Sequence, residues 1–83
     1  MEQPNIFIYS TNGCKYCEQA KTLLKMKGLE YEEKMVLSTD DRMMLKEQFP
    51  NARSFPIVTV DGVHIGGFTQ LQDWIKTITD SLR

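Results

Sequence analysis

The sequence predicts an α/β fold with its elements in the order β-α-β-α-β-β-α. Short apolar runs suited to strands alternate with segments in which apolar residues recur at helical spacing, and turn residues separate them. A strand, a helix and a strand in succession imply a parallel, right-handed crossover, whereas the Asp61-Gly62 pair predicts an antiparallel hairpin. We therefore expect a four-stranded mixed sheet with three helices.

The first strand is predicted over residues 6–9, and it should be central because its residues are apolar on both faces. Asn12 and Gly13 favour a sharp turn after this strand. The helix that follows opens at the cysteines and ends at Gly28, because glycine is common just past a helix C-terminus. Its apolar residues at helical spacing are Ala20, Leu23, Leu24 and Met26.

A second strand is predicted over residues 31–37, after the glycine stop. Ser38 and Asp41 then have the spacing of a capping box, in which side chains bond the free N–H groups at a helix start. We expect a helix over residues 40–49 that Pro50 ends. The side chains of this helix that we expect to fill the core are Met43, Met44, Leu45 and Phe49.

Two further strands are predicted as a hairpin. Pro56 precedes a strand over residues 57–60, a position where the sheet requires no N–H donor. Residues 61–62 are a strong two-residue turn signal and lead into a strand over residues 63–65. His64 lies in this last strand, and we interpret it as an ordinary residue of an edge strand.

The last helix is predicted to start at Thr69, because Thr69 and Gln72 have capping-box spacing. Gly66 and Gly67 precede it and allow the backbone to pass close to a ligand or to another segment. A single apolar stripe should pack this helix on the sheet. The stripe consists of Leu71, Trp74, Ile75, Ile78 and Leu82.

The composition is that of an ordinary protein domain without a strong charge. The net charge is -1 and the pI is about 5.7, so no basic field attracts nucleic acid or an anionic membrane. No apolar run approaches the roughly 20 residues of a membrane helix, and the N-terminus lacks a signal-peptide pattern. We expect one domain over residues 1–83, present as a cytoplasmic monomer.

The two cysteines indicate a redox site. Cys14 and Cys17 are three positions apart at a predicted helix start, which places them on one face and within the roughly 4.4 to 6.8 Å between Cα atoms that a disulfide requires. A zinc site takes four ligands as a rule, and His64 is the only histidine available to join them, so we expect no metal. A disulfide used only for stability would close a very small loop.

We assign Cys14 as the attacking thiolate and Cys17, one helical turn inside, as the resolving thiol. Thiols of Cys-x-x-Cys pairs at helix starts have pKa values of about 3.5 to 7.5, because free N–H groups and the helix dipole favour the anion. The ammonium of Lys15 should favour the thiolate further. We expect Gly13 to help by removing side-chain bulk beside the reacting sulfur.

Three stretches of the chain resemble the signature motifs of the dithiol glutaredoxins, in the same order and spacing. They are Cys14-Lys15-Tyr16-Cys17, Ser54-Phe55-Pro56-Ile57-Val58 and His64-Ile65-Gly66-Gly67-Phe68-Thr69. The resemblance implies a thioredoxin-like fold and a glutathione-dependent thiol–disulfide oxidoreductase. Such an enzyme reduces protein disulfides and glutathione mixed disulfides, with glutathione as co-substrate and disulfide-bearing proteins as partners.

The resemblance also implies a glutathione site formed by Tyr16, Arg53, Ser54, Phe55, Pro56, Gly67, Phe68, Thr69 and Gln70. In the family, the residue before a cis proline binds the cysteinyl part of glutathione through its backbone, which here is Phe55. The γ-glutamyl carboxylate would bind the Phe68 backbone and Thr69, at a helix N-terminus that favours anions. Arg53 would pair with the glycine carboxylate, and Tyr16 would flank the groove.

The chain departs from the family pattern at three positions. Lys15 replaces the proline most common between the cysteines, and its charge favours the thiolate. Gln70 stands where many members have an acidic residue near the glutathione amine. Thr11 stands at a position that is often basic, which leaves less positive potential over the glutathione carboxylates.

Two other functions stay open. One is a glutaredoxin-like electron donor for ribonucleotide reductase that a thioredoxin reductase reduces, although Arg53 and Thr69 favour glutathione. The other is a non-enzymatic carrier in which two protomers hold an iron–sulfur cluster with Cys14 and two glutathiones. The bulk of Lys15 and Tyr16 disfavours the carrier. The reductant that regenerates the dithiol, and the colour of the purified protein, would separate these functions.

Overall fold

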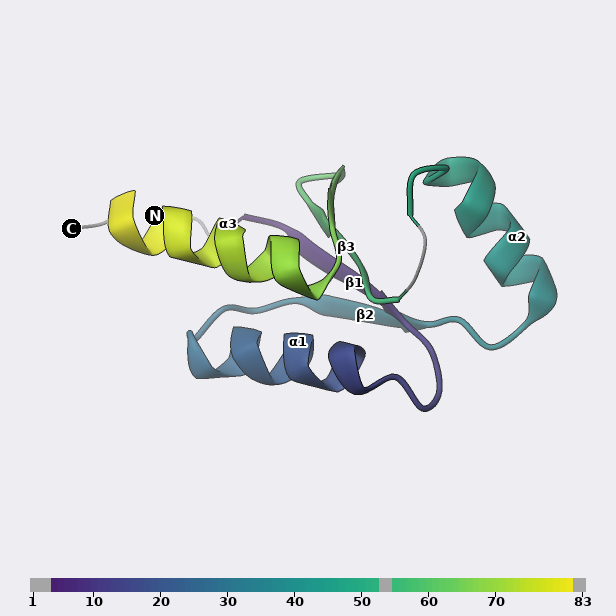
Figure 1. Cartoon of the computed structure of the whole chain (residues 1–83), viewed down its shortest axis with the longest axis horizontal. Helices are drawn as coiled ribbons and strands as arrows, with labels where there is room; N and C mark the ends of the chain where they lie inside the picture. Colours follow the sequence, from purple (N-terminus) through teal and green to yellow (C-terminus); the bar gives the residue numbers. More distant parts are fainter. Residues whose placement is uncertain (1–3, 53–54, 82–83) are drawn as a thin grey trace.

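The computed structural model describes residues 4–52 and 55–81, with side chains described through residue 78. Within these ranges the chain forms the predicted four strands and three helices around one sheet (Figure 1). The elements are β1 (Ile6–Ser10), α1 (Lys15–Met26), β2 (Glu32–Met35), α2 (Thr39–Gln48), β3 (Ile57–Val60), β4 (Val63–Gly66) and α3 (Phe68–Ser81). None of the helices in the described ranges combines the length and the apolarity that crossing a bilayer requires.

The sheet has the strand order β2-β1-β3-β4. β1 pairs with β2 in parallel and with β3 in antiparallel orientation, and β3 pairs with β4 in antiparallel orientation. These pairings confirm the mixed sheet, the parallel crossover and the interior position of β1. The Asp61-Gly62 hairpin is also confirmed, and Asp61 holds it against the start of β1 through an Asn5 N–H···Oδ1 bond of 2.9 Å.

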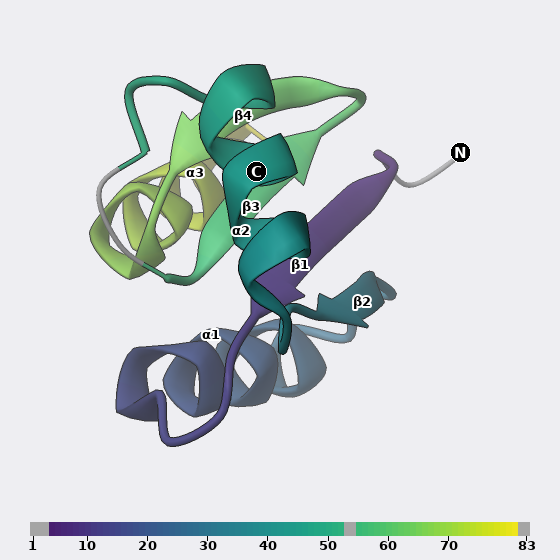
Figure 2. The ribbon, with the colours of Figure 1, turned by 90° about the vertical axis from the view of Figure 1, so that its right-hand side faces the viewer.

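Different helices cover the two faces of the sheet. On one face, the larger core cluster joins the sheet to α1 and α3, and it consists of Ile6, Ile8, Ala20, Leu24, Val58, Val60, Leu71 and Ile75. On the other face, a smaller cluster joins α2 to the sheet through Val36, Leu45, Phe49 and Ile57. In Figures 1 and 2, α1 lies alongside β2, and in Figure 1 α2 lies at the opposite end of the molecule from the last turn of α3.

The expectation that Met43 and Met44 fill the core is wrong. Their side chains are 60% and 67% exposed, whereas Leu45 and Phe49 are buried as expected. Helical spacing identifies a face that is able to pack, but it does not show how much of that face meets another layer. The described residues place only the Leu45 and Phe49 edge of α2 against the sheet.

The predicted start of the last helix is also wrong by one residue. α3 begins at Phe68, the Leu71 N–H donates to the Gly67 carbonyl at 3.0 Å, and the Gly67 N–H donates to Gln70 Oε1 at 2.9 Å. Gly67 is therefore the capping residue and Gln70 reaches back to it, in place of the expected Thr69 and Gln72 box. Leu82, expected in the apolar stripe, lies outside the described residues.

The second strand is shorter than predicted and more exposed. β2 spans Glu32–Met35, and all four of its residues are exposed, as suits a charged edge strand. The buried residue of the predicted segment is Val36, just beyond β2, whose N–H donates to the Ser10 carbonyl at 2.7 Å. The second predicted strand thus ends in a core residue that the smaller cluster uses.

We predict that Leu71→Ala lowers the free energy of unfolding by about 2 to 5 kcal/mol, because Leu71 is fully buried between α3 and the sheet and its loss leaves a cavity. Met44→Ala, at an exposed position of α2, should change it by no more than about 0.5 kcal/mol. Urea unfolding of both variants tests the assignment of the core. Equal losses in the two variants would contradict it.

Candidate active site

Cys14 is the N-cap of α1, so the helix opens at the cysteines as predicted. Its backbone is extended, with φ -95 and ψ 106, and its sulfur accepts the Cys17 N–H at 3.1 Å. The sulfur therefore takes the place that a serine or aspartate oxygen holds in an ordinary cap. An N–H donor stabilises a negative acceptor more than a neutral one, so this arrangement suits a thiolate.

The segment before β3 meets Cys14 from the other side. The Phe55-Pro56 peptide bond is cis, as the resemblance implied. The Cys14 thiol donates to the Phe55 carbonyl oxygen at an S···O distance of 3.7 Å, which places the Phe55 backbone beside the reacting sulfur. Of the predicted residues on this segment, Arg53 and Ser54 lie outside the described residues.

The two thiols differ sharply in environment. Both are free cysteines, but Cys14 is partly exposed whereas Cys17 is 1% exposed. Burial, together with the Cys14 sulfur beside it, raises the pKa of Cys17 to about 11. Cys17 is therefore a neutral thiol at neutral pH, and Cys14 is the sulfur that a substrate is able to reach.

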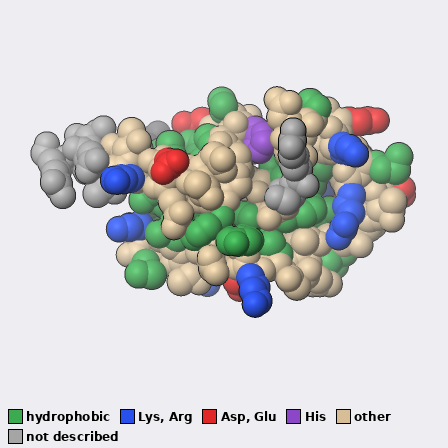
Figure 3. All heavy atoms as spheres, viewed as in Figure 1, with side chains coloured by type: hydrophobic (Ala, Val, Ile, Leu, Met, Phe, Trp, Pro, Cys, Tyr) green, Lys and Arg blue, Asp and Glu red, His purple; other side chains and the backbone are tan. Residues whose placement is uncertain are grey.

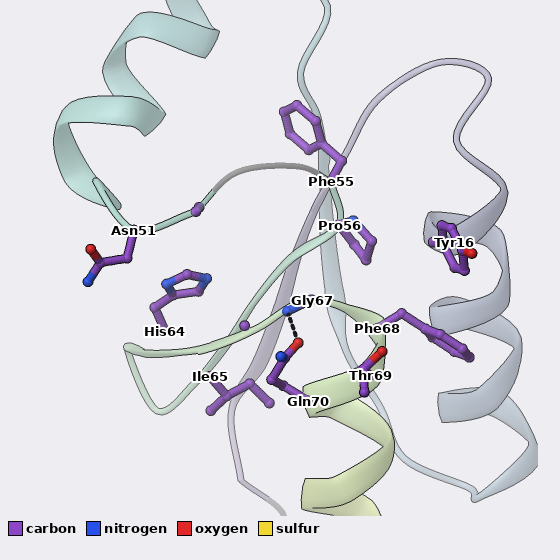
Figure 4. Close-up of a pocket in the computed structure, with 12 residues that line it drawn as sticks. Tyr16, Asn51, Phe55, Pro56, His64, Ile65, Gly67, Phe68, Thr69 and Gln70 are labelled. Carbon is purple, nitrogen blue, oxygen red and sulfur yellow. Dashed lines mark hydrogen bonds between the residues drawn. The ribbon is translucent and has the colours of Figure 1, made fainter.

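A groove of about 580 Å³ begins next to this dithiol (Figure 4). Cys14 does not line it, but the Phe55 that Cys14 contacts does. The lining residues are Tyr16, Asn51, Ala52, Phe55, Pro56, His64, Ile65, Gly66, Gly67, Phe68, Thr69 and Gln70. The groove thus brings together every described residue that we expected to bind glutathione.

Aromatic side chains and a helix start form one side of this groove. Tyr16 on α1 and Phe68 on α3 face each other with ring centroids 6.0 Å apart. Figure 3 shows hydrophobic side chains at the surface between these two helices. Thr69 and Gln70 lie in the first turn of α3, where backbone N–H groups have no partner within the helix and favour an anion.

Gln70 also packs closely on the strand before it. A Cβ at Gly66 would come within 2.6 Å of the Gln70 side chain, so any other residue at position 66 would push that side chain away. The same side chain caps α3 through Gly67. The end of β4 and the start of α3 are therefore held as one unit at the groove.

The structure shows why the turn before Cys14 needs a glycine. A Cβ at Gly13 would meet no atom within 4 Å beyond its two neighbours in the chain, so packing against other segments does not require a glycine there. Its φ is +70, in the left-handed region that favours glycine, and it lets the chain turn from β1 into the cap. Lys15, the other residue expected to activate the thiol, is exposed at the first position of α1.

Arg42 on α2 is a feature of the site that the sequence pattern did not identify. Its Nη2 donates to Thr11 Oγ1 at 3.1 Å, and its guanidinium carbon lies 5.8 Å from the centre of the Phe55 ring. Thr11 in turn donates to the Val36 carbonyl at 3.1 Å. Thr11 stands at a position that is often basic in the family, and it thus holds Arg42 from α2 beside the site.

Asn51 and His64 were likewise not predicted to line the groove. His64 lies in the edge strand β4, as expected, with its ring 5.2 Å from that of Phe49. The signals available in the sequence were that His64 is the first residue of one of the three motifs and that Asn51 lies shortly before another. The described residues contain no group of three or more His, Cys, Asp or Glu side chains able to hold a metal ion.

Comparison with known proteins decides the family. The glutaredoxin family model matches residues 6–65. The chain belongs to the glutaredoxin family. Among curated glutaredoxins, it is 39% identical to glutaredoxin 1 of Rickettsia bellii over 75 residues, which covers 86% of this chain and 76% of that protein.

Solved glutaredoxins share the fold. The crystal structure of glutaredoxin 1 from Francisella tularensis complexed with cacodylate matches with a TM-score of 0.81 and 25% identity, over 93% of this chain and 98% of that one. A buckwheat glutaredoxin–glutathione complex matches with a TM-score of 0.71 and 24% identity, over 89% and 70% of the two chains. Family and fold together make this glutaredoxin a thiol–disulfide oxidoreductase.

We predict that iodoacetamide at neutral pH modifies Cys14 and leaves Cys17 unmodified in the folded protein, because Cys17 is buried and its pKa is about 11. Modification of Cys17 should rise as the pH approaches 11, since only the thiolate is alkylated. Peptide mass mapping after a short exposure measures both sites. In denaturant the two cysteines should react alike, and preferential modification of Cys17 in the folded state would contradict the assigned roles.

Proposed function

We propose that this chain is a glutathione-dependent oxidoreductase that reduces protein disulfides and glutathione mixed disulfides with Cys14 and Cys17. The observation that supports this most directly is the position of the Cys14 sulfur. It caps α1 and contacts the carbonyl of Phe55, a residue that lines the groove. A nucleophile at the end of a groove suits a substrate in which the scissile disulfide is attached to a peptide.

The reaction is a series of two-electron exchanges between sulfurs. The Cys14 thiolate attacks a substrate disulfide, forms a mixed disulfide and releases the substrate's other sulfur as a thiolate, which takes up a proton. Cys17 then loses its proton and attacks Cys14, which releases the second substrate sulfur and leaves the Cys14-Cys17 disulfide. Two glutathione thiols reduce this disulfide in turn and leave as oxidised glutathione. With a glutathionylated substrate, Cys14 acts without Cys17.

The groove and the residues beside it offer receptors for each part of glutathione. The backbone of Phe55 suits the cysteinyl residue, and the first turn of α3 suits the γ-glutamyl carboxylate. Arg42 does not line the groove, but it is bound to Thr11 and lies near the ring of Phe55, from where it would offer a cation to the glycine carboxylate. The buckwheat glutaredoxin of the same fold is known as a glutathione complex.

We predict that Cys14→Ser abolishes turnover of all substrates, whereas Cys17→Ser retains removal of glutathione from a mixed disulfide. Only Cys14 forms a bond to substrate, and Cys17 is needed only to close the intramolecular disulfide. The measurement is reduction of a small glutathione mixed disulfide, coupled to glutathione reductase and NADPH. Equal loss in both variants would overturn the roles.

The same assay tests the choice of reductant. Regeneration of the dithiol by a thioredoxin reductase with NADPH, in the absence of glutathione, would refute glutathione dependence and favour the electron-donor function. Ribonucleotide reductase is one protein substrate to include in both arms. The Phe55 and α3 receptors are the features that lead us to expect glutathione to be the faster reductant.

We predict that Arg42→Ala raises KM for a glutathionylated substrate about fivefold, the effect of losing an exposed ion pair of about 1 kcal/mol. The turnover number kcat should change less, because Arg42 contacts no sulfur. Lys46→Ala is the matched control, since it removes one positive charge from the same helix. The KM difference should shrink at high salt, and equal KM values in the two variants would exclude Arg42 from binding.

A further inference from the structure

A cluster of polar side chains lies between α1 and the sheet, behind the dithiol. Ser10, two residues beyond Ile8, is on the face of β1 that packs against α1, and Glu33 is the partner of Ile8 in the parallel ladder. On α1, Lys21 is one turn after Cys17, on the same side of the helix. An ion pair with 2.8 Å between Lys21 Nζ and Glu33 Oε2 links α1 to β2 within this cluster.

The Ser10 hydroxyl is the unusual member of this cluster. Ser10 is 1% exposed, and its Oγ is the one buried side-chain N or O atom, among the described residues, that lacks a hydrogen bond of ordinary geometry. A buried unpaired hydroxyl is costly, so it calls for an explanation. Burial first and the Cys14 sulfur second raise the pKa of Cys17, and the Thr11 backbone and the Ser10 hydroxyl act in the opposite direction. Lys21 is the main cause of the lowered pKa of Glu33, and the Ser10 hydroxyl adds to it.

We infer that Ser10 is a positioning residue for the resolving step, whose hydroxyl turns to donate a hydrogen bond to the Cys17 sulfur as that sulfur becomes a thiolate. The inference deepens the proposed function, but it rests on the dithiol chemistry of the family and not on glutathione. The step needs such a donor because Cys17 is buried away from water when it must hold a negative charge.

The resolving step is balanced without any further reactant. Cys17 gives its proton to solvent, and the Ser10 O–H donates to the sulfur anion that remains. The Cys17 thiolate attacks the Cys14 sulfur of the mixed disulfide. The Cys14-Cys17 bond forms, the bond from Cys14 to the substrate sulfur breaks, and the substrate sulfur leaves as a thiolate that takes up a proton.

Glu33 is not the base for this step. Its ion pair with Lys21 lowers the pKa of the carboxyl below its ordinary value of 4.5, whereas the pKa of Cys17 is about 11. A proton moved from Cys17 to Glu33 would therefore go strongly uphill. Lys21 instead offsets the carboxylate charge that would otherwise oppose a nearby thiolate.

The charged and titratable groups around this cluster come from α1 with its cap and from β2. They are Cys14, Glu18, Lys21, Lys25 and Glu33. Glu33 also feels the Ser10 hydroxyl, but Lys21 is the main cause of the low pKa of its carboxyl, so Glu33 stays charged at neutral and higher pH when the hydroxyl is removed. A change in the ionisation of Cys17 is therefore attributable to the hydroxyl.

The first test measures the ionisation of Cys17 in a Cys14→Ser background, by its alkylation rate as a function of pH. Ser10→Ala should lower the rate about threefold at any pH below the pKa of Cys17. The loss of one hydrogen-bond donor raises that pKa by about one unit, which lowers the thiolate fraction about tenfold, whereas the more basic thiolate reacts about threefold faster. Ser10→Thr and Ser10→Val form an isosteric pair that differs in the hydroxyl. Ser10→Thr should keep the pH dependence of Cys17 alkylation that the parent shows, and Ser10→Val should resemble Ser10→Ala.

Thr59→Val is the matched control for loss of a buried hydroxyl. Thr59 is 6% exposed and pairs with Phe7, which puts it on the opposite face of the same sheet. It should destabilise the fold without moving the Cys17 profile. Should Ser10→Ala fail to fold, the Thr and Val pair decides the question.

The second test follows the resolving step in a single turnover. With Cys17 present, Ser10→Ala should slow release of the second substrate thiol about threefold, the net factor expected when the pKa of the attacking thiol rises by about one unit. With Cys17→Ser, it should leave removal of glutathione unchanged. If the alkylation rate of Cys17 has the same pH dependence in Ser10→Thr and Ser10→Val, the inference is overturned. Slow turnover with glutathione but a hydroxyl-dependent Cys17 profile would refute only glutathione dependence.

Discussion

The site depends on one hydrogen bond, from the Cys17 N–H to the Cys14 sulfur at 3.1 Å. It exists because β1 ends four residues before Cys14 and Gly13 turns the chain so that Cys14 takes an extended, capping conformation. The side chain that caps the helix is thereby the one that reacts. A helix start always has N–H groups to satisfy, and here the partner is a nucleophile.

The same helix start makes the two sulfurs unequal. One turn separates them, and over that distance the surroundings change from a groove edge to the core between α1 and the sheet. The raised pKa of Cys17 follows from this burial first, and from the neighbouring sulfur second. The order of the two steps in thiol–disulfide exchange is therefore built into the packing, because only the outer sulfur is both reachable and placed against a donor.

Much of the fold could be predicted from spacing alone, because each element has a period and a turn signal of its own. The central β1, the parallel crossover and the hairpin followed from those local rules. The exposure of Met43 and Met44 did not follow from these rules, because helical spacing does not reveal how small a part of the surface of α2 packs against the sheet. The cap of α3 was misplaced because glutamines at positions 70 and 72 both fit the pattern, and only Gln70 reaches Gly67.

The site residues that could be predicted lie within sequence motifs. The site residues that were missed reach the site only through tertiary packing. Arg42 reaches Thr11 across 31 positions of sequence, and His64 comes to the groove because β4 pairs beside β3. No local pattern encodes either approach. The sequence shows that position 11 lacks the positive charge common in the family, but it does not show that Arg42 of α2 brings a positive charge to the same place.

The tight contact between Gly66 and Gln70 limits how this groove is able to vary. A larger residue at the end of β4 would displace a side chain that also holds the first turn of α3, so strand and helix would have to change together. Variation in specificity is consequently easier on the wall formed by Asn51 and Ala52, in the segment that follows α2. A designer who wishes to retarget this protein to other peptides would begin there and leave the glycine untouched.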